Sequence, residues 1–433
     1  MSGTNIIQLT DGLGQLTNID QHISVNWKLK DCGLGYHVVA IFGSQSTGKS
    51  TLLNALFGTD FNTMDASSGR MQTTKGIWMG KSANANILVM DVEGVDGQER
   101  GEDKLVERRS ALFSLAIAEV FVINVYEAII GLYSGANTEL FKTIFEANTR
   151  PAEEKKNCKT LLLFVIRDYA GQTPLEFHKS ALCDNMAKIW DDIAKPEHLR
   201  NSLFSDFFDC TIVGLPPKPI MPDQFSKAVD GLRLRFTDPN HSDYVFKPRY
   251  HRGIPIDGFS RYASGIWDAV LADDMLSIPS QQMLLAEHRC TELRSEAEAA
   301  FKQSTSAINT LINDGKAVDG LGKLMEKARN EAIAMFDANA KHYHQDVYTE
   351  MRNKLCGTFD EELTAFFRIR LKIVAAQISD QFDAKIEPLS ADTISEYIES
   401  ANVIVLNALD DFDRTTNGMM QTCMLRCISS IRL

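Results

Sequence analysis

Residues 43–50, which read GSQSTGKS, constrain this chain more than any other segment because they fit the pattern G-x-x-x-x-G-K-[ST] in full. The segment follows an apolar run at residues 36–42 and leads into a helical pattern at 51–57. Glycines let the backbone wrap closely around a phosphate, and a helix N-terminus supplies positive partial charge. The residues expected to bind nucleotide phosphates are Gly43, Ser44, Gln45, Ser46, Thr47, Gly48, Lys49, Ser50 and Thr51.

Short apolar runs rich in β-branched residues alternate with helical patterns over the first 250 residues. Runs of this length, bounded by Gly, Asp or Glu, are typical of buried strands in a mostly parallel sheet with helices between them. The runs cover residues 36–42, 87–90, 120–125, 160–166 and 210–213, and residues 73–80 are expected to lead into a further strand. The pattern predicts an α/β P-loop domain, a mostly parallel sheet flanked by helices.

The composition and periodicity of the sequence change after these 250 residues. Seven of the 12 prolines fall in residues 214–255, which predicts an irregular, loop-rich connection. Beyond Gly258, apolar residues recur at three- and four-residue steps, which places them on one face of long helices. Gly357 and Pro388 are expected to interrupt these helices. We therefore predict two domains, an α/β domain over residues 1–250 and an all-α helical bundle or stalk over residues 251–433.

Composition excludes several classes of protein. Subtracting 57 acidic from 45 basic residues gives a formal charge of −12, which leaves no overall basic footprint for nucleic acid. The eight cysteines include no CxxC pair, which favours a reduced, cytosolic environment. The N-terminus lacks a signal-peptide pattern, and the most apolar stretch, residues 110–132, is interrupted by Glu119 and Glu127. We expect these 433 residues to be soluble.

Two elements predict that the bound nucleotide is accompanied by Mg²⁺. Lys49 can reach the β- and γ-phosphates, and the Ser50 hydroxyl can ligate the metal ion. Residues 91–94, which read DVEG, follow an apolar strand and fit the pattern D-x-x-G. Asp91 would hold the Mg²⁺ shell through water, and the Gly94 N–H would sense the γ-phosphate.

A candidate switch loop lies between these two elements, at residues 67–76. A threonine there could ligate Mg²⁺ only when the γ-phosphate is present, which is how such loops become ordered. Thr74 is the preferred residue, with Thr73 as its alternative. The other interpretation is a plain surface loop.

The residues that would read the base are less distinctive. The common pattern Asn/Thr-Lys-x-Asp is absent, and the run at residues 160–166 ends instead in Arg167 and Asp168. A carboxylate at this edge of the sheet can accept hydrogen bonds from guanine N1–H and N2–H, a donor pair that adenine lacks. A surface ion pair is the alternative, and an ATPase remains the competing assignment of the nucleotide.

Together these motifs resemble the dynamin-like GTPases of the atlastin class, above all the Root Hair Defective / synthetic-enhancer-of-Yop branch. The matching segments are residues 43–50, 72–78 (QTTKGIW), 91–100 (DVEGVDGQER) and 167–168. Further matches lie at Gly258-Phe259, Ile266-Trp267 and Ile278-Pro279, leading to Arg289-Cys290. The resemblance covers roughly residues 10–300, and beyond residue 310 it depends on helical character alone.

The resemblance implies a GTP-hydrolysing protein that tethers and fuses endoplasmic reticulum membranes. Two copies on opposing membranes would dimerise through their GTPase domains when GTP binds. Asp168 would read guanine, and Val213 and Gly214 would form the remaining wall of the base pocket. The implied partners are a second copy, reticulon-type membrane-shaping proteins, and a membrane held through a C-terminal region, and the full-length protein would sit on the cytosolic face. This chain would then be the soluble front part of a longer protein.

Two questions stay open within this resemblance. Several relatives carry an arginine inside the P-loop, whereas this loop has Ser44–Thr47 in its place, closer to the dynamin pattern. Arg70 is our hypothesis for the catalytic cation, with an ion-pairing loop residue as its alternative; Gln45 and Ser46 could instead position water or a monovalent cation. The alternative function is a nucleotide-gated assembly scaffold like the guanylate-binding proteins, without fusion activity.

Overall fold

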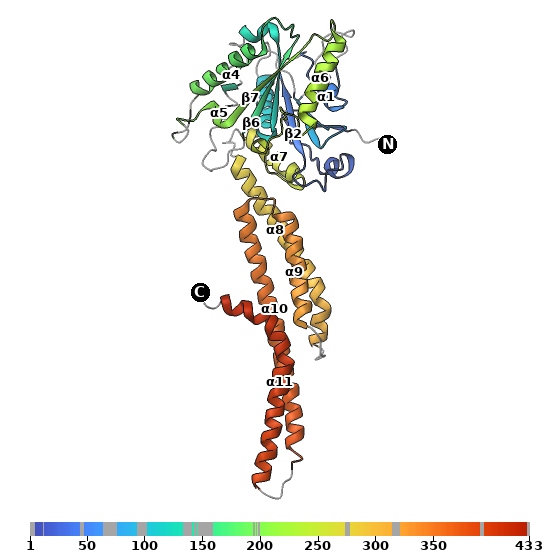
Figure 1. The fold of residues 1–433 in the computed structure, drawn as a ribbon, viewed down its shortest axis with the longest axis vertical. Coiled ribbons are helices and arrows are strands. Elements are labelled where there is room, and N and C mark those ends of the chain that lie inside the picture. Colours follow the sequence, from blue (N-terminus) through green and yellow to red (C-terminus); the bar gives the residue numbers. More distant parts are fainter. Residues whose placement is uncertain are drawn as a thin grey trace. The chain divides into compact units, whose positions relative to one another are not determined.

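The computed structural model contains two compact units, residues 1–285 and residues 286–433 (Figure 1). It describes residues 5–11, 13–43, 47–63, 76–92, 102–132, 141–142, 145, 159–193, 195, 197, 200–272, 278–313, 321–389 and 394–430. Helix α7 (Ile256–Leu271) belongs to the first unit, beyond the predicted limit at residue 250. The boundary at residue 250 between a GTPase-type domain and a helical domain, as the sequence suggests it, stays a prediction.

The first unit is built on a seven-stranded sheet with the order β1-β3-β4-β2-β5-β6-β7. Strands β4, β2, β5, β6 and β7 are parallel. Strand β3 pairs antiparallel with β4, and β1 pairs antiparallel with β3 at the edge of the sheet. The strands are β1 (Ile6–Thr10), β2 (His37–Phe42), β3 (Ile77–Lys81), β4 (Ile87–Val92), β5 (Val120–Tyr126), β6 (Thr160–Arg167) and β7 (Phe208–Leu215). The mostly parallel sheet confirms the predicted α/β fold class.

Helices cover this sheet and complete its hydrophobic core. They are α1 (Lys49–Phe57), α2 (Glu102–Ile117), α4 (Leu175–Asp192), α5 (Phe204–Phe207), α6 (Pro222–Thr237) and α7, with the shorter helices η1 (His22–Asn26), η2 (Glu127–Leu132) and η4 (Pro248–Tyr250). Helices α1 and α6 lie against each other (Figure 1), where the rings of Phe57 and Phe236 meet edge to face at 5.1 Å. Helices α2 and α7 pack in the same way through Phe113 and Trp267, whose ring centroids are 5.3 Å apart.

The proline-rich segment is more regular than the sequence predicts, because helix α6 occupies its middle. Pro222 is the first residue of this helix, a position where its missing N–H has no intrahelical partner in any case. The buried side chains that follow recur at helical spacing: Phe225, Val229, Leu232 and Phe236. The expectation of an irregular, loop-rich connection over residues 214–255 was therefore wrong for residues 222–237, where α6 forms.

The second unit consists of α-helices, as predicted. Helices α9 (Leu321–Ala340), α10 (Gln345–Ile386) and α11 (Ile394–Ser430) pack against one another, and α11 folds back along α10 (Figure 1). Helix α8 (Ile278–Asn313) contributes Phe301, which stacks on Phe359 of α10 with ring centroids 4.3 Å apart. No helix in the described part of the chain is long and apolar enough to cross a membrane.

Two details of the helical prediction need correction. Gly357 does not interrupt α10, which continues for 42 residues through it. One glycine costs a helix only about 1 kcal/mol relative to alanine, and the buried neighbours Leu355 and Phe359 offset this cost. The apolar residues that recur at helical spacing from Met325 to Met351 also do not share a single helix, since α9 ends at Ala340 and α10 begins at Gln345.

Candidate nucleotide-binding site

The candidate site lies at the C-terminal ends of the parallel strands. In the sheet register Ile41 of β2 lies beside Asp91 of β4, and Phe42 lies beside Ile123 of β5. Arg167 at the end of β6 lies beside Leu215 at the end of β7. In open α/β sheets ligands bind outside these carboxyl ends, because the loops that follow the strands converge there.

Two glycines give the loop after β2 its shape. Gly43 has φ of +152°, and a Cβ atom there would lie 2.4 Å from the Asn124 carbonyl oxygen. Gly48 is the N-cap of α1 and has the left-handed φ of +76°. A side chain at Gly43 would clash with β5, and one at Gly48 would strain the backbone. The chain can therefore pass from β2 into α1 only with glycine at both positions.

The lysine and serine at the start of α1 make hydrogen bonds that suit the phosphate and metal contacts predicted for them. Lys49 is buried, and its Nζ donates a hydrogen bond to the Gly43 carbonyl oxygen at 3.0 Å. The Ser50 hydroxyl donates to Asp91 Oδ2 at 2.6 Å, and Asp91 is only 1% exposed. A hydroxyl beside a buried carboxylate is an oxygen donor pair that suits Mg²⁺, which prefers hard oxygen ligands. These residues therefore fit the metal ion that the motif implies.

Two polar side chains support the loop from the neighbouring strands. Asn124 Nδ2 donates to the Thr47 carbonyl oxygen at 2.9 Å. Arg167 Nη1 donates to the carbonyl oxygens of Thr47 at 3.2 Å and Gly48 at 3.3 Å. Burial lowers the pKa of the Arg167 guanidinium, which also lies over the Phe225 ring at 5.5 Å. Both side chains fix the backbone of the loop rather than facing solvent.

Asn124 carries no motif that would have singled it out in the sequence. Its one signal is chemical: an amide near the end of an otherwise apolar run, next to the strand that precedes the glycine-rich loop. A buried amide needs hydrogen-bond partners, so its position predicts a polar contact at the sheet edge. Thr51 lies inside α1, one residue beyond Ser50.

Asp168 follows β6 directly and is exposed at the same edge of the sheet. It has a left-handed φ of +58°, which turns the chain sharply out of the strand. The next residue, Tyr169, donates its N–H to the Leu215 carbonyl oxygen at 3.0 Å, and its ring packs on Gly214. The end of β7, including Val213 and Gly214, is thereby held beside Asp168.

A histidine–carboxylate pair braces the loop that follows Asp168. Glu127 at the start of η2 accepts the Ala170 N–H at 3.0 Å, and its other carboxylate oxygen meets His178 Nε2 at 3.1 Å. His178 belongs to α4, so this carboxylate joins the loop to both a strand end and a helix. The remaining predicted site residues, Ser44, Gln45, Ser46, Arg70, Thr73, Thr74 and Gly94, lie outside the described residues.

This combination of strand, glycine-rich loop, helix and buried aspartate defines a P-loop nucleotide-binding domain. Comparison with known families is more specific. The profile of the Root hair defective 3 GTP-binding protein (RHD3) GTPase domain matches residues 42–279, and that of the Sey1 three-helix bundle domain matches residues 319–428.

Curated relatives agree with both profiles. Protein SEY1 of Laccaria bicolor is 46% identical over 80% of this chain and 44% of its own length. Protein SEY1 of Cryptococcus neoformans var. neoformans is 48% identical over 80% of this chain and 42% of its own length. Protein sey1 of Aspergillus flavus is 42% identical over 93% of this chain and 50% of its own length.

The chain belongs to the RHD3/Sey1 family of GTPases, and residues 42–279 form its GTPase domain. It therefore binds GTP through the P-loop unit and carries the helical bundle characteristic of Sey1. The chain spans half or less of the length of these relatives.

Proposed function

We propose that the first unit binds GTP with Mg²⁺ and hydrolyses it at the edge of the sheet described above. The P-loop backbone and Lys49 would hold the phosphates, while Ser50, Thr74 and, through water, Asp91 would hold Mg²⁺. The metal ion would neutralise charge on the phosphate oxygens. The observation that carries this proposal is the hydrogen bond from Ser50 to the buried Asp91, directly beside the buried Lys49 that reaches back to the Gly43 carbonyl.

Asp168 would select guanine in this proposal. Its carboxylate would accept hydrogen bonds from guanine N1–H and N2–H, while Val213 and Gly214 would form the other wall. The contact between the Tyr169 ring and Gly214 supports this assignment, because it keeps the end of β7 beside the exposed carboxylate. Arg167 would act indirectly, since its guanidinium holds the P-loop carbonyls of Thr47 and Gly48.

The catalytic cation is a separate part of the proposal. Arg70 would stabilise charge that develops on the transferring phosphoryl group, a contribution of about 10³–10⁵ in rate where such an arginine acts. We expect Arg70→Ala to lower kcat strongly while GTP affinity stays largely unchanged, as measured by single-turnover hydrolysis and nucleotide titration. The control is Arg261→Ala, at an exposed position on α7. An unchanged kcat in Arg70→Ala would leave Gln45 and Ser46 as the candidates.

The biological output that we propose is tethering and fusion of endoplasmic reticulum membranes by the full-length protein. GTP would dimerise two copies through their GTPase units, and hydrolysis would move the helical units and bring the membranes together. Membership of the RHD3/Sey1 family supports this proposal. The membrane contact would come from a part of the protein beyond these residues, with reticulon-type proteins as further partners.

Light scattering tests the dimer directly. The purified chain should have the mass of a monomer with GDP and of a dimer with GDP·AlF₄⁻, with Lys49→Ala monomeric in both. A monomer under every condition would overturn the tethering mechanism. For full-length protein in two populations of liposomes, lipid mixing that requires GTP hydrolysis supports fusion. Assembly without lipid mixing would instead favour the scaffold function.

A further inference from the structure

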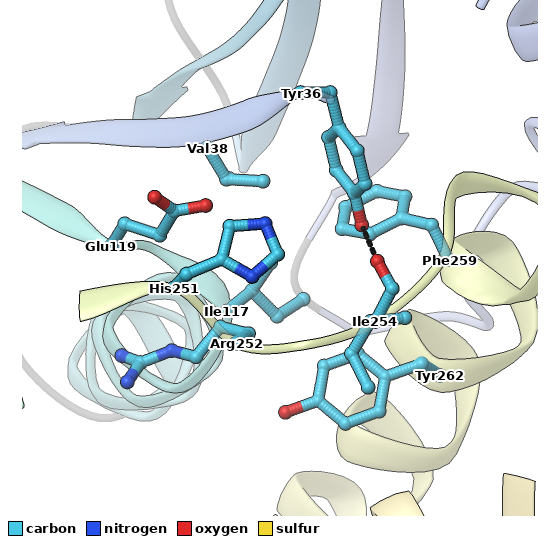
Figure 2. A pocket seen from close by; sticks show the side chains of 9 residues that line it. All are labelled: Tyr36, Val38, Ile117, Glu119, His251, Arg252, Ile254, Phe259 and Tyr262. Atoms are coloured by element: carbon cyan, nitrogen blue, oxygen red, sulfur yellow. Dashed lines mark hydrogen bonds between the residues drawn. The ribbon is translucent and has the colours of Figure 1, made fainter. Parts of the chain in front are cut away.

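A second cluster of functional side chains lies at the opposite end of the sheet from the P-loop. His37 is the first residue of β2, Glu119 immediately precedes β5, and His251 follows η4. One donor atom from each of these three side chains lies within 4.8 Å of the other two. In Figure 2 the Glu119 carboxylate and the His251 imidazole lie next to each other, on the wall of a small cavity.

The two imidazole rings are held by specific contacts. His37 Nδ1 meets Glu119 Oε2 at 2.8 Å, and the His37 ring stacks on Phe246 with centroids 3.9 Å apart. His251 Nε2 donates to the Leu34 carbonyl oxygen at 3.1 Å, while its Nδ1 accepts the Gly253 N–H at 2.9 Å. His251 is therefore a neutral imidazole with its lone pair on Nδ1, which is the form that binds metal ions.

We propose that His37, Glu119 and His251 form a binding site for a divalent transition-metal ion, with Zn²⁺ as the ion of best fit. Two imidazoles and one carboxylate are a ligand set that zinc uses with a fourth position open, whereas Mg²⁺ and Ca²⁺ prefer oxygen ligands alone. Bonds of about 2.0–2.1 Å in a tetrahedron space the ligand atoms about 3.4 Å apart. Rotation of the two rings would bring the ligand atoms to this spacing. The ion would take the place of the proton between His37 Nδ1 and Glu119 Oε2, which is released to solvent, and of the Gly253 N–H at His251 Nδ1.

The surroundings provide charge, space and access for this ion. Glu119 is 2% exposed, so its carboxylate is shielded from water and interacts strongly with a positive charge placed beside it. Arg252 also lines the cavity, and its Nη2 donates to the carbonyl oxygens of Leu115 and Ala118 and to the Thr160 hydroxyl. The cavity of about 10 Å³ has room for one water as the fourth ligand. The His37 side chain is 26% exposed, so an ion can reach the site from solvent.

Binding would connect three segments that are far apart in the sequence. His251 lies in the segment that leads into α7, and this segment already contacts the start of the sheet. The Tyr36 hydroxyl donates to the Ile254 carbonyl oxygen at 2.9 Å (Figure 2), and the Ile256 N–H donates to the Gly33 carbonyl oxygen at 3.0 Å. A metal ion at His251 would reinforce this attachment, so zinc is expected to stabilise the GTPase unit without entering the nucleotide site.

The proposal is tested by titrating the chelator-treated chain with ZnCl₂ in a calorimeter. Excess Mg²⁺ and GDP are present throughout, so that the Ser50–Asp91 site is already occupied. We expect one equivalent of zinc to bind, with metal analysis of the desalted protein giving the same stoichiometry and the Tm rising. Absence of stoichiometric binding to the unmodified chain would overturn the proposal, whatever the variants do.

Variants locate the site. His37→Gln, Glu119→Gln and His251→Gln should each weaken zinc binding by more than about a hundredfold, the upper range for losing an outer-shell partner alone. Retained GDP binding, at the other end of the sheet, verifies that a variant is folded. The matched control is His288→Gln, which removes an imidazole from a histidine–carboxylate pair with Glu292 on α8. Undiminished zinc binding in all three folded variants would place the ion elsewhere, for example on cysteine thiols, and would overturn the assignment.

Discussion

The two units of this chain differ in how far polar side chains build their interiors. In the GTPase unit Lys49, Asp91 and Arg167 are buried, and their hydrogen bonds connect the P-loop, helix α1 and two strand ends. In the helical unit the core is formed mainly by apolar side chains such as Phe359, and the ion pair between Arg329 and Asp360 is partly exposed. Single polar contacts should therefore decide activity in the first unit, whereas apolar packing should decide stability in the second.

The largest expected effect concerns the P-loop lysine. Lys49→Ala removes the cation expected to contact the β- and γ-phosphates, so GTP hydrolysis should fall by about 10³-fold or more in a phosphate-release assay. The Tm of the helical unit should stay the same. Lys323→Ala, at an exposed position on α9, is the control and should keep full activity. Near-normal turnover in Lys49→Ala would remove the P-loop from the mechanism.

The helical unit should show the reverse behaviour. Phe359 is 1% exposed and stacks on Phe301, so Phe359→Ala should lower the free energy of unfolding of this unit by about 3–5 kcal/mol. Urea unfolding followed by circular dichroism measures this loss, and Phe359→Leu, which leaves a smaller cavity, should lose less. GTP affinity should not change. A large loss of GTP affinity in Phe359→Ala would contradict the division of roles between the two units.

A smaller effect is expected at Asn124. Its amide donates to the Thr47 carbonyl oxygen, so Asn124→Ala should cost about 1–3 kcal/mol, seen as weaker GTP binding and a lower Tm of the GTPase unit. Asn86 provides the matched control, because its Nδ2 also donates to a backbone carbonyl, that of Gly35 at 3.2 Å, but at the exposed surface. Equal effects in Asn86→Ala and Asn124→Ala would show that burial of this contact is irrelevant.

The smallest effect should come from the ion pair of the helical unit. Arg329 Nε lies 2.8 Å from Asp360 Oδ1, but the aspartate side chain is 46% exposed. Solvent screens such pairs, so a double-mutant cycle with Arg329→Ala and Asp360→Ala should give a coupling of about 0.2–1 kcal/mol. The coupling should shrink further at 1 M salt. A coupling above that range, unchanged by salt, would mean that polar contacts matter equally in both units.

The sequence predicted the parts of the molecule that depend on local pattern. The P-loop with its flanking strand and helix, the parallel strands and the helical second unit all follow from short-range spacing. Long-range pairing was not predictable in the same way. Strand β1 pairs with β3 some 70 residues away, and helix α6 forms within a proline-rich segment because its buried face packs on α1.

The orientation of side chains at the site also depends on tertiary structure. Arg167 could be placed at a strand end from the sequence, but the direction of its guanidinium toward the Thr47 carbonyl depends on which strand lies next to which. The same applies to Asn124, whose role appears only when β5 lies beside β2. Contacts between residues 77 and 120 positions apart leave no local signature.

The most direct test of the central claim is nucleotide selection by Asp168, measured by calorimetric titration of the unmodified chain and of Asp168→Asn with GTP, ATP and XTP. Xanthine carries a carbonyl where guanine has its 2-amino group, so it needs a donor such as an amide in place of the carboxylate. Hydrogen bonds to charged groups contribute about 1.5–3 kcal/mol. We therefore predict that the unmodified chain prefers GTP. Asp168→Asn should bind GTP at least about tenfold more weakly and should gain affinity for XTP. Equal binding of GTP and ATP by the unmodified chain, or unchanged GTP affinity in Asp168→Asn, would contradict it.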